Sequence, residues 1–112
     1  MTIAAWWSAY VVTQAIEIPY YLVATRGRPW FARIVIAAGA STMTHPMVWF
    51  VLPGLGWPNY WVYFAVAEGF AVVVEALLLA AVEVRRPLLW SLAANAGSVA
   101  IGAALRALID WP

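Results

Sequence analysis

Four long apolar stretches, separated by short turns, dominate the pattern of hydrophobic and polar positions. They cover residues 3–24, 30–52, 60–84 and 88–109, and each is long enough to cross about 30 Å of hydrocarbon as a helix. The turns at 25–29 and 85–87 are basic and end in proline, whereas the turn at 53–59 is uncharged and rich in proline and glycine. The pattern predicts an all-α integral membrane protein, a single domain of residues 1–112 that forms an antiparallel four-helix transmembrane bundle.

The composition favours a membrane protein over a water-soluble helical domain. Of 112 residues, 66% are hydrophobic and 10% are charged, and the mean hydropathy is +0.86. The absence of cysteine excludes disulfides and thiolate metal sites. The net charge is only +1 and no basic face could follow a phosphate backbone, so we expect no nucleic-acid partner. The expected partner is the lipid bilayer.

The arginines predict how the chain is oriented. Arg26, Arg28, Arg33, Arg85 and Arg86 belong to the first and third turns, and only Arg106 falls toward the opposite side. By the positive-inside rule those two turns are cytoplasmic. Both termini and the turn at 53–59 are then extracytoplasmic, and the expected location is the cytoplasmic (inner) membrane. The eight tryptophans map near the ends of the stretches, as in an aromatic belt.

Five candidate binding residues are among the polar side chains that fall at membrane depth. Glu68 and Glu75 are seven residues apart on one face of the third stretch, about 10 Å along a helix axis. A charged group there costs on the order of 2–3 kcal/mol or more, so the other stretches must supply polar partners. Counting from the turns places Glu17, Glu75 and Asn95 in an inner polar layer, and His45 and Glu68 in an outer one.

These residues support a function based on ions or protons. A carboxyl at membrane depth can hold a proton and release it when a cation arrives. We therefore expect Glu17, Glu68, Glu75, His45 and Asn95 to bind cations or protons, as in cation- or proton-coupled transport. A purely structural role is the alternative, since interhelical polar contacts contribute about 0.6 kcal/mol each.

Two other functions stay open: an accessory subunit of a larger membrane complex, and an intramembrane metal-dependent enzyme. His45 and Glu68 are candidate metal ligands, but zinc sites use three or four protein ligands. The sequence contains no nucleophile motif such as G-x-S-x-G and no glycine-rich phosphate loop. We therefore predict no catalytic residue and no cofactor.

Small residues on the fourth stretch predict helix packing. Ser91, Ser98 and Gly102 share one face with Asn95, and such faces let helices approach closely. We expect this face to join two copies of the chain in a homo-oligomer. On the first and second stretches, Pro19 and Pro46 each remove a backbone N–H and are expected to kink their helices.

The size, and a carboxylate in the first of four spans, are similar to those of small multidrug resistance exporters. The three membrane glutamates and the Thr44-His45-Pro46 step depart from that family. The sequence is therefore assigned to no family.

Overall fold

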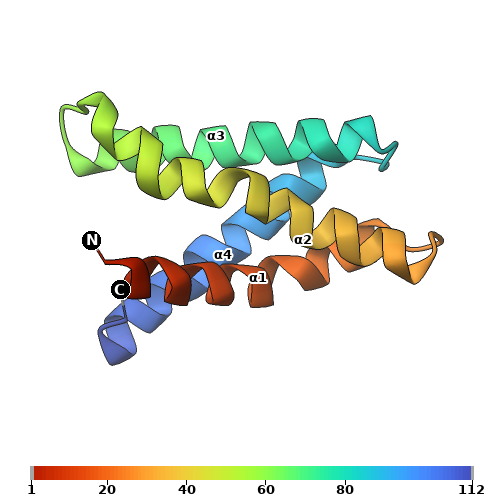
Figure 1. Cartoon of the computed structure of the whole chain (residues 1–112), viewed down its shortest axis with the longest axis horizontal. Helices are drawn as coiled ribbons and strands as arrows, with labels where there is room; N and C mark the ends of the chain where they lie inside the picture. Colours follow the sequence, from red (N-terminus) through yellow and green to blue (C-terminus); the bar gives the residue numbers. More distant parts are fainter. Residues whose placement is uncertain (1, 112) are drawn as a thin grey trace.

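Four long helices build the molecule, as predicted. The computed structural model describes residues 2–111, and in these the helices are α1 (Ile3–Ala24), α2 (Trp30–Pro46), α3 (Tyr60–Ala81) and α4 (Pro87–Ile109). α2 continues as a π-helix, η1 (Met47–Val51), and a 3₁₀-helix, η2 (Leu52–Leu55). Successive helices run in opposite directions, so both termini and the turn at 53–59 lie at one end (Figure 1). The two arginine-rich turns lie at the other end, which we call the arginine end.

Residues of the turns start the helices at the positions that the sequence indicates. The side chains of Thr2 and Asn59 accept hydrogen bonds from the backbone N–H of Ala5 and Val62, each at 3.0 Å, which caps α1 and α3. Pro87 is the first residue of α4, where its missing N–H costs nothing. α3 ends at Ala81, three residues earlier than the predicted stretch, and Val84 instead packs into the core.

The helices close into a ring. α1 packs against α2 and α4, and α3 packs against the same two helices from the other side. α4 runs obliquely behind the others, from the end of α3 to beneath α1 (Figure 1). The apolar core lies toward the arginine end and consists of Tyr21, Ala37, Ala40, Leu79, Val84 and Ala94. The ring is therefore filled at the arginine end.

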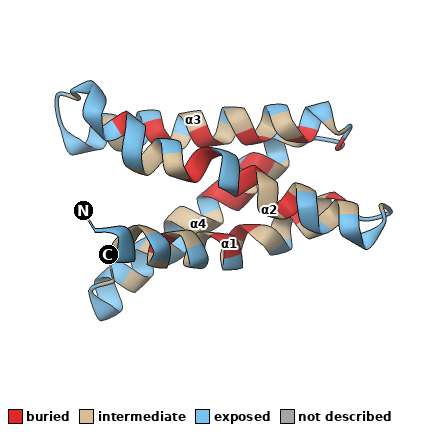
Figure 2. Cartoon of the chain, viewed as in Figure 1, coloured by how far each residue is buried: buried red, intermediate tan, exposed pale blue. Residues whose placement is uncertain are grey.

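The outer surface of the bundle is apolar, as lipid requires. Among residues 2–111, three segments are long and apolar enough to cross a membrane: Trp30–Leu55, Tyr60–Ala81 and Pro87–Ile109. α1 has the length, at 22 residues, but its inward stripe carries Gln14 and Glu17. Large side chains such as Phe31 and Leu108 are more than four-fifths exposed, and exposed positions cover the outer faces of the helices (Figure 2). Exposing this apolar surface to water would be energetically unfavourable, so the chain belongs in a membrane.

Arginines tie the two basic turns together. Arg28 Nη2 donates to the carbonyl of Val82 at 2.7 Å, which joins the first turn to the third. Arg33 donates to the carbonyl of Leu22 through Nε at 3.2 Å and Nη2 at 2.5 Å, and its guanidinium lies 4.0 Å from the ring centre of Trp30. These bonds satisfy carbonyls at helix C-termini that have no partner within their helix.

Pro46 changes the helix type of the second span. Immediately after it, the chain widens into the π-helix η1 and then tightens into η2, because proline supplies no N–H to the preceding turn. Side chains satisfy carbonyls in this irregular segment. Tyr63 donates to the carbonyl of Val48 at 2.7 Å, and Trp57 Nε1 donates to that of Leu52 at 2.6 Å. Irregular segments of this kind recur at functional sites.

Candidate intramembrane binding cavity

A cavity of about 600 Å³ lies between all four helices. Its lining runs from Glu75 and Asn95, which lie in the halves of α3 and α4 nearer the arginine end, to Tyr60 and Trp111 beside the termini. Small side chains leave this space open: Ala9, Ala71, Gly102, Ala103 and Ala107 all line it. The bundle is thus packed at the arginine end and hollow toward the termini.

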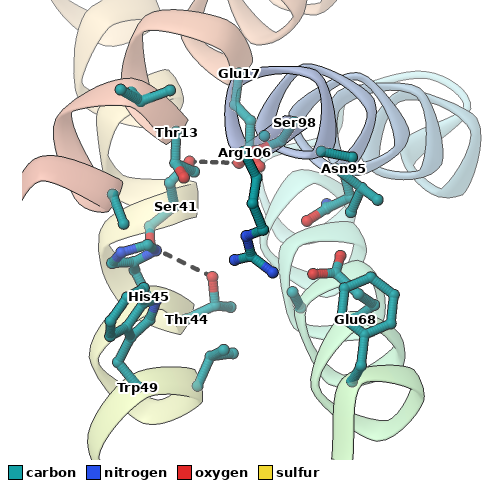
Figure 3. A pocket seen from close by; sticks show the side chains of 18 of the residues that line it. Thr13, Glu17, Ser41, Thr44, His45, Trp49, Glu68, Asn95, Ser98 and Arg106 are labelled. Carbon is teal, nitrogen blue, oxygen red and sulfur yellow. Dashed lines mark hydrogen bonds between the residues drawn. The ribbon is translucent and has the colours of Figure 1, made fainter. Parts of the chain in front are cut away.

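All five predicted ion- or proton-binding residues line this one cavity. They are Glu17, His45, Glu68, Glu75 and Asn95. The two predicted layers correspond to two depths of one space, and Figure 3 shows polar side chains entering it from every helix. The packing residues Ser98 and Gly102 line it as well.

Glu75 is the hydrogen-bonding centre at the inner end of the cavity. Its side chain is 2% exposed. Tyr21 Oη donates to Oε1 at 2.5 Å, Asn95 Nδ2 donates to the same oxygen at 3.2 Å, and Thr44 Oγ1 donates to Oε2 at 2.9 Å. One carboxyl therefore connects all four helices. Tyr21 was not among the predicted site residues, although it lies on the polar face of α1 four residues after Glu17.

Glu17 lies beside this centre on α1. It is also 2% exposed, and Ser41 Oγ on α2 donates to its Oε1 at 2.7 Å. One turn earlier, Gln14 Nε2 donates to Thr42 Oγ1 at 3.0 Å and to the carbonyl of Ala38 at 3.2 Å. The polar stripe of α1 therefore packs on the hydroxyl-bearing face of α2, and it directs Glu17 into the cavity.

His45 and Glu68 line the cavity from α2 and α3, but aromatic rings hold the histidine. Its ring centre lies 5.5 Å from that of Tyr10, 5.9 Å from that of Trp49 and 6.1 Å from that of Trp6. His45 is 8% exposed, and its Nε2 has no hydrogen-bond partner among residues 2–111. The rings meet His45 in tilted or edge-on orientations, and a buried polar atom at the cavity wall is left without a partner in the described chain.

Arg106 is a cavity residue that the sequence analysis missed. It lines the cavity from α4, and its guanidinium extends into the space between α2 and α3, on the side where Glu68 projects (Figure 3). The signal was present in the spacing. Arg106 follows Gly102 by four residues, so it continues the face that holds Asn95 and Ser98. The charge distribution alone indicates no more than a basic residue near the end of the fourth stretch.

The small-residue face of α4 packs within the chain. Ser91 Oγ donates to the carbonyl of Val72 at 2.7 Å, and Ser91 and Asn95 are 0% and 5% exposed. This part of the face therefore packs against α3 within one chain, and the expected homo-oligomer stays a prediction. The packing role predicted for Ser91 agrees with its contact to α3.

A metal centre finds no support in this geometry. Within residues 2–111, no group of three or more His, Cys, Asp or Glu side chains is arranged to hold a metal ion. Comparison with known proteins gives no further guide: no family model, no curated protein and no solved structure matches the chain. The cavity must be interpreted from its own chemistry.

Proposed function

We propose that this chain is a small membrane protein that binds a cation in its cavity in exchange for protons, as in cation- or proton-coupled transport. The observation that carries the proposal is that all three membrane glutamates line one cavity. Its volume of about 600 Å³ lies within the range of small-molecule sites. Ionisable residues at membrane depth mark ion and substrate pathways more often than packing contacts.

The two ends of the cavity support an exchange between solution and the middle of the bundle. Glu68 lies closer to the termini and Glu75 lies deeper, where three donors replace water around its carboxyl. Beyond Glu75, Tyr21, Leu79 and Val84 fill the bundle. A cation arriving from the termini side meets carboxyls that release protons on the same side. A bundle open at one end and packed at the other corresponds to one of the two states that alternating access requires.

Carbodiimide labelling of the reconstituted protein tests this proposal. The reagent modifies protonated carboxyls in an apolar environment, so Glu68 and Glu75 are expected to react, and a transported cation is expected to protect them. Glu68→Gln and Glu75→Gln should each remove one labelled position. Glu83→Gln is the matched control, because Glu83 is an exposed carboxyl in the turn after α3.

Proton release on cation addition supplies a second measurement. A pH-sensitive dye should report protons leaving the wild-type protein when sodium or an organic ammonium ion is added, with less released by the Glu68→Gln variant. Unprotected labelling, no proton release and full cellular function in all the glutamine variants would contradict the proposal. That result would favour the accessory-subunit alternative.

A further inference from the structure

The charged residues that line the cavity indicate what kind of ligand it binds. We infer that the cavity takes a small organic zwitterion with an apolar body, whose ammonium group faces Glu68 and whose anionic group faces Arg106. This inference rests on the proposed function, since it names the substrate class of the same site. It follows from the size of the cavity, the placement of its charges and the nature of its outer walls.

The size of the cavity argues against a bare metal ion. A metal cation is held by several ligands that converge at about 2.0–2.6 Å, and no such group of acidic and histidine side chains occurs in residues 2–111. A space of about 600 Å³ instead matches an organic molecule of many atoms.

The placement of opposite charges argues for a ligand with two charges. Glu68 on α3 and Arg106 on α4 line the same cavity, and Figure 3 shows the guanidinium and the Glu68 carboxyl entering one space. A simple cation would meet Arg106 as a like charge, and a simple anion would meet three glutamates. A zwitterion pairs with both signs, the half-buried carboxyl of Glu68 and the exposed guanidinium of Arg106. The guanidinium fork suits a carboxylate or phosphate group in particular.

The outer walls fit an apolar body. Aromatic side chains line the cavity toward the termini: Trp49, Tyr60, Trp61, Phe64 and Trp111. Such rings accept apolar groups on their faces and attract ammonium groups by cation–π interaction. His45 Nε2 is a buried polar atom of the same cavity with no partner in the described chain. Because such atoms are rarely left unsatisfied, it is a natural hydrogen-bonding position for a ligand.

Three related probes separate the charges. Phenylalanine carries both charges, its methyl ester only the positive one, and N-acetylphenylalanine only the negative one. Binding to purified protein in lipid nanodiscs can be followed by equilibrium dialysis of the radiolabelled compounds. Phenylalanine is expected to bind most tightly of the three. A second zwitterion, leucine, controls for the aromatic ring of the probe.

The variants then assign each charge to a residue. Arg106→Gln should weaken phenylalanine binding about tenfold, the scale of a lost charge-assisted pair, and leave methyl ester binding unchanged or stronger. The affinity of Arg106→Lys for phenylalanine should fall between those of Arg106→Gln and wild type, because lysine keeps the charge but lacks the paired N–H donors of the guanidinium. Glu68→Gln should weaken phenylalanine and its ester together. Arg85→Gln, an exposed arginine at the far end, should change nothing, and thermal unfolding of each variant checks its fold.

The outcomes separate this inference from the proposed function. Three results would each contradict the inference that the ligand is a zwitterion. They are equal binding of the three probes, binding by neither zwitterion, and an Arg106→Gln effect that is the same for phenylalanine and its ester. Sodium-driven proton release would then still support exchange of a simple cation. Conversely, zwitterion binding that depends on Arg106 but releases no protons would establish the ligand class and contradict the exchange.

Discussion

At the scale of single residues, the carboxyl of Glu75 holds the bundle together as much as it serves the cavity. Its three donors come from α1, α2 and α4. Average interhelical polar contacts in membranes contribute about 0.6 kcal/mol, but a buried group left without a partner costs roughly 1–3 kcal/mol. Because Glu75 accepts three hydrogen bonds, a substitution that removes one of them should lower the stability of the fold more than the loss of an isolated polar contact would.

Removing the Tyr21 hydroxyl tests this sensitivity. Tyr21→Phe should lower the free energy of unfolding by about 1 kcal/mol, because Oε1 of a 2% exposed carboxyl loses one donor. Thermal or denaturant unfolding in detergent measures the change. Tyr60→Phe is the matched control, since Tyr60 is 51% exposed and should tolerate the loss. Equal stability of the two variants would show that the Tyr21–Glu75 bond contributes nothing net.

At the scale of the helices, Gly97 on α4 leaves room for the side chain of Tyr20 on α1. A β-carbon at Gly97 would lie 2.6 Å from Tyr20 Oη and 3.1 Å from two carbons of its ring. Tyr20 would have to turn away, and the contact between the two helices would loosen. The fourth stretch thus uses its small residues inside the chain, as Ser91 also does against α3.

Gly97→Ala should destabilise the protein in spite of the higher helix propensity of alanine. Gly69→Ala provides the comparison, because nothing lies within 4 Å of a β-carbon there. The gain in propensity, up to about 1 kcal/mol, should then appear without a steric cost. In a double-mutant cycle, Tyr20→Ala should relieve the Gly97→Ala defect. Additive effects of the two substitutions would mean that the close approach does not limit stability.

At the scale of the whole molecule, the two ends differ in packing and in charge. The arginine end is tied by backbone contacts from Arg28 and Arg33 and filled by the apolar core. The other end contains the cavity and both termini. If the arginines are cytoplasmic, as their distribution predicts, the cavity lies on the extracytoplasmic side.

Single cysteines test this orientation, because the natural sequence contains none. Gly54→Cys lies in the turn beside the cavity, and Glu83→Cys lies in the third turn without removing an arginine. In intact bacterial cells, a membrane-impermeant maleimide should label Gly54→Cys, and it should label Glu83→Cys only after lysis. The reverse pattern would place the cavity on the cytoplasmic side.

Periodicity and depth counting predicted which residues face inward, but not which of them touch. The spacing of Glu68 and Glu75, and of Asn95 with Ser98 and Gly102, correctly placed these residues around the bundle interior. The partners of Glu75 and the aromatic surroundings of His45 depend on how neighbouring helices are rotated relative to one another. The periodicity of a single helix gives no information about that rotation. Arg106 was recoverable from its spacing, but a charge near a helix end is equally typical of a loop.

The order of apolar and polar residues is enough to predict the four helices, their antiparallel order and the polar stripe on each, because helix length and period follow from that order. The packing of the helices in three dimensions is what brings the stripes together around a cavity at one end of the bundle. The same packing places Ser91, on the small-residue face of α4, against α3. Those outcomes depend on the crossing of α4 and on which small side chains face each other, and both are set by packing between segments far apart in the chain.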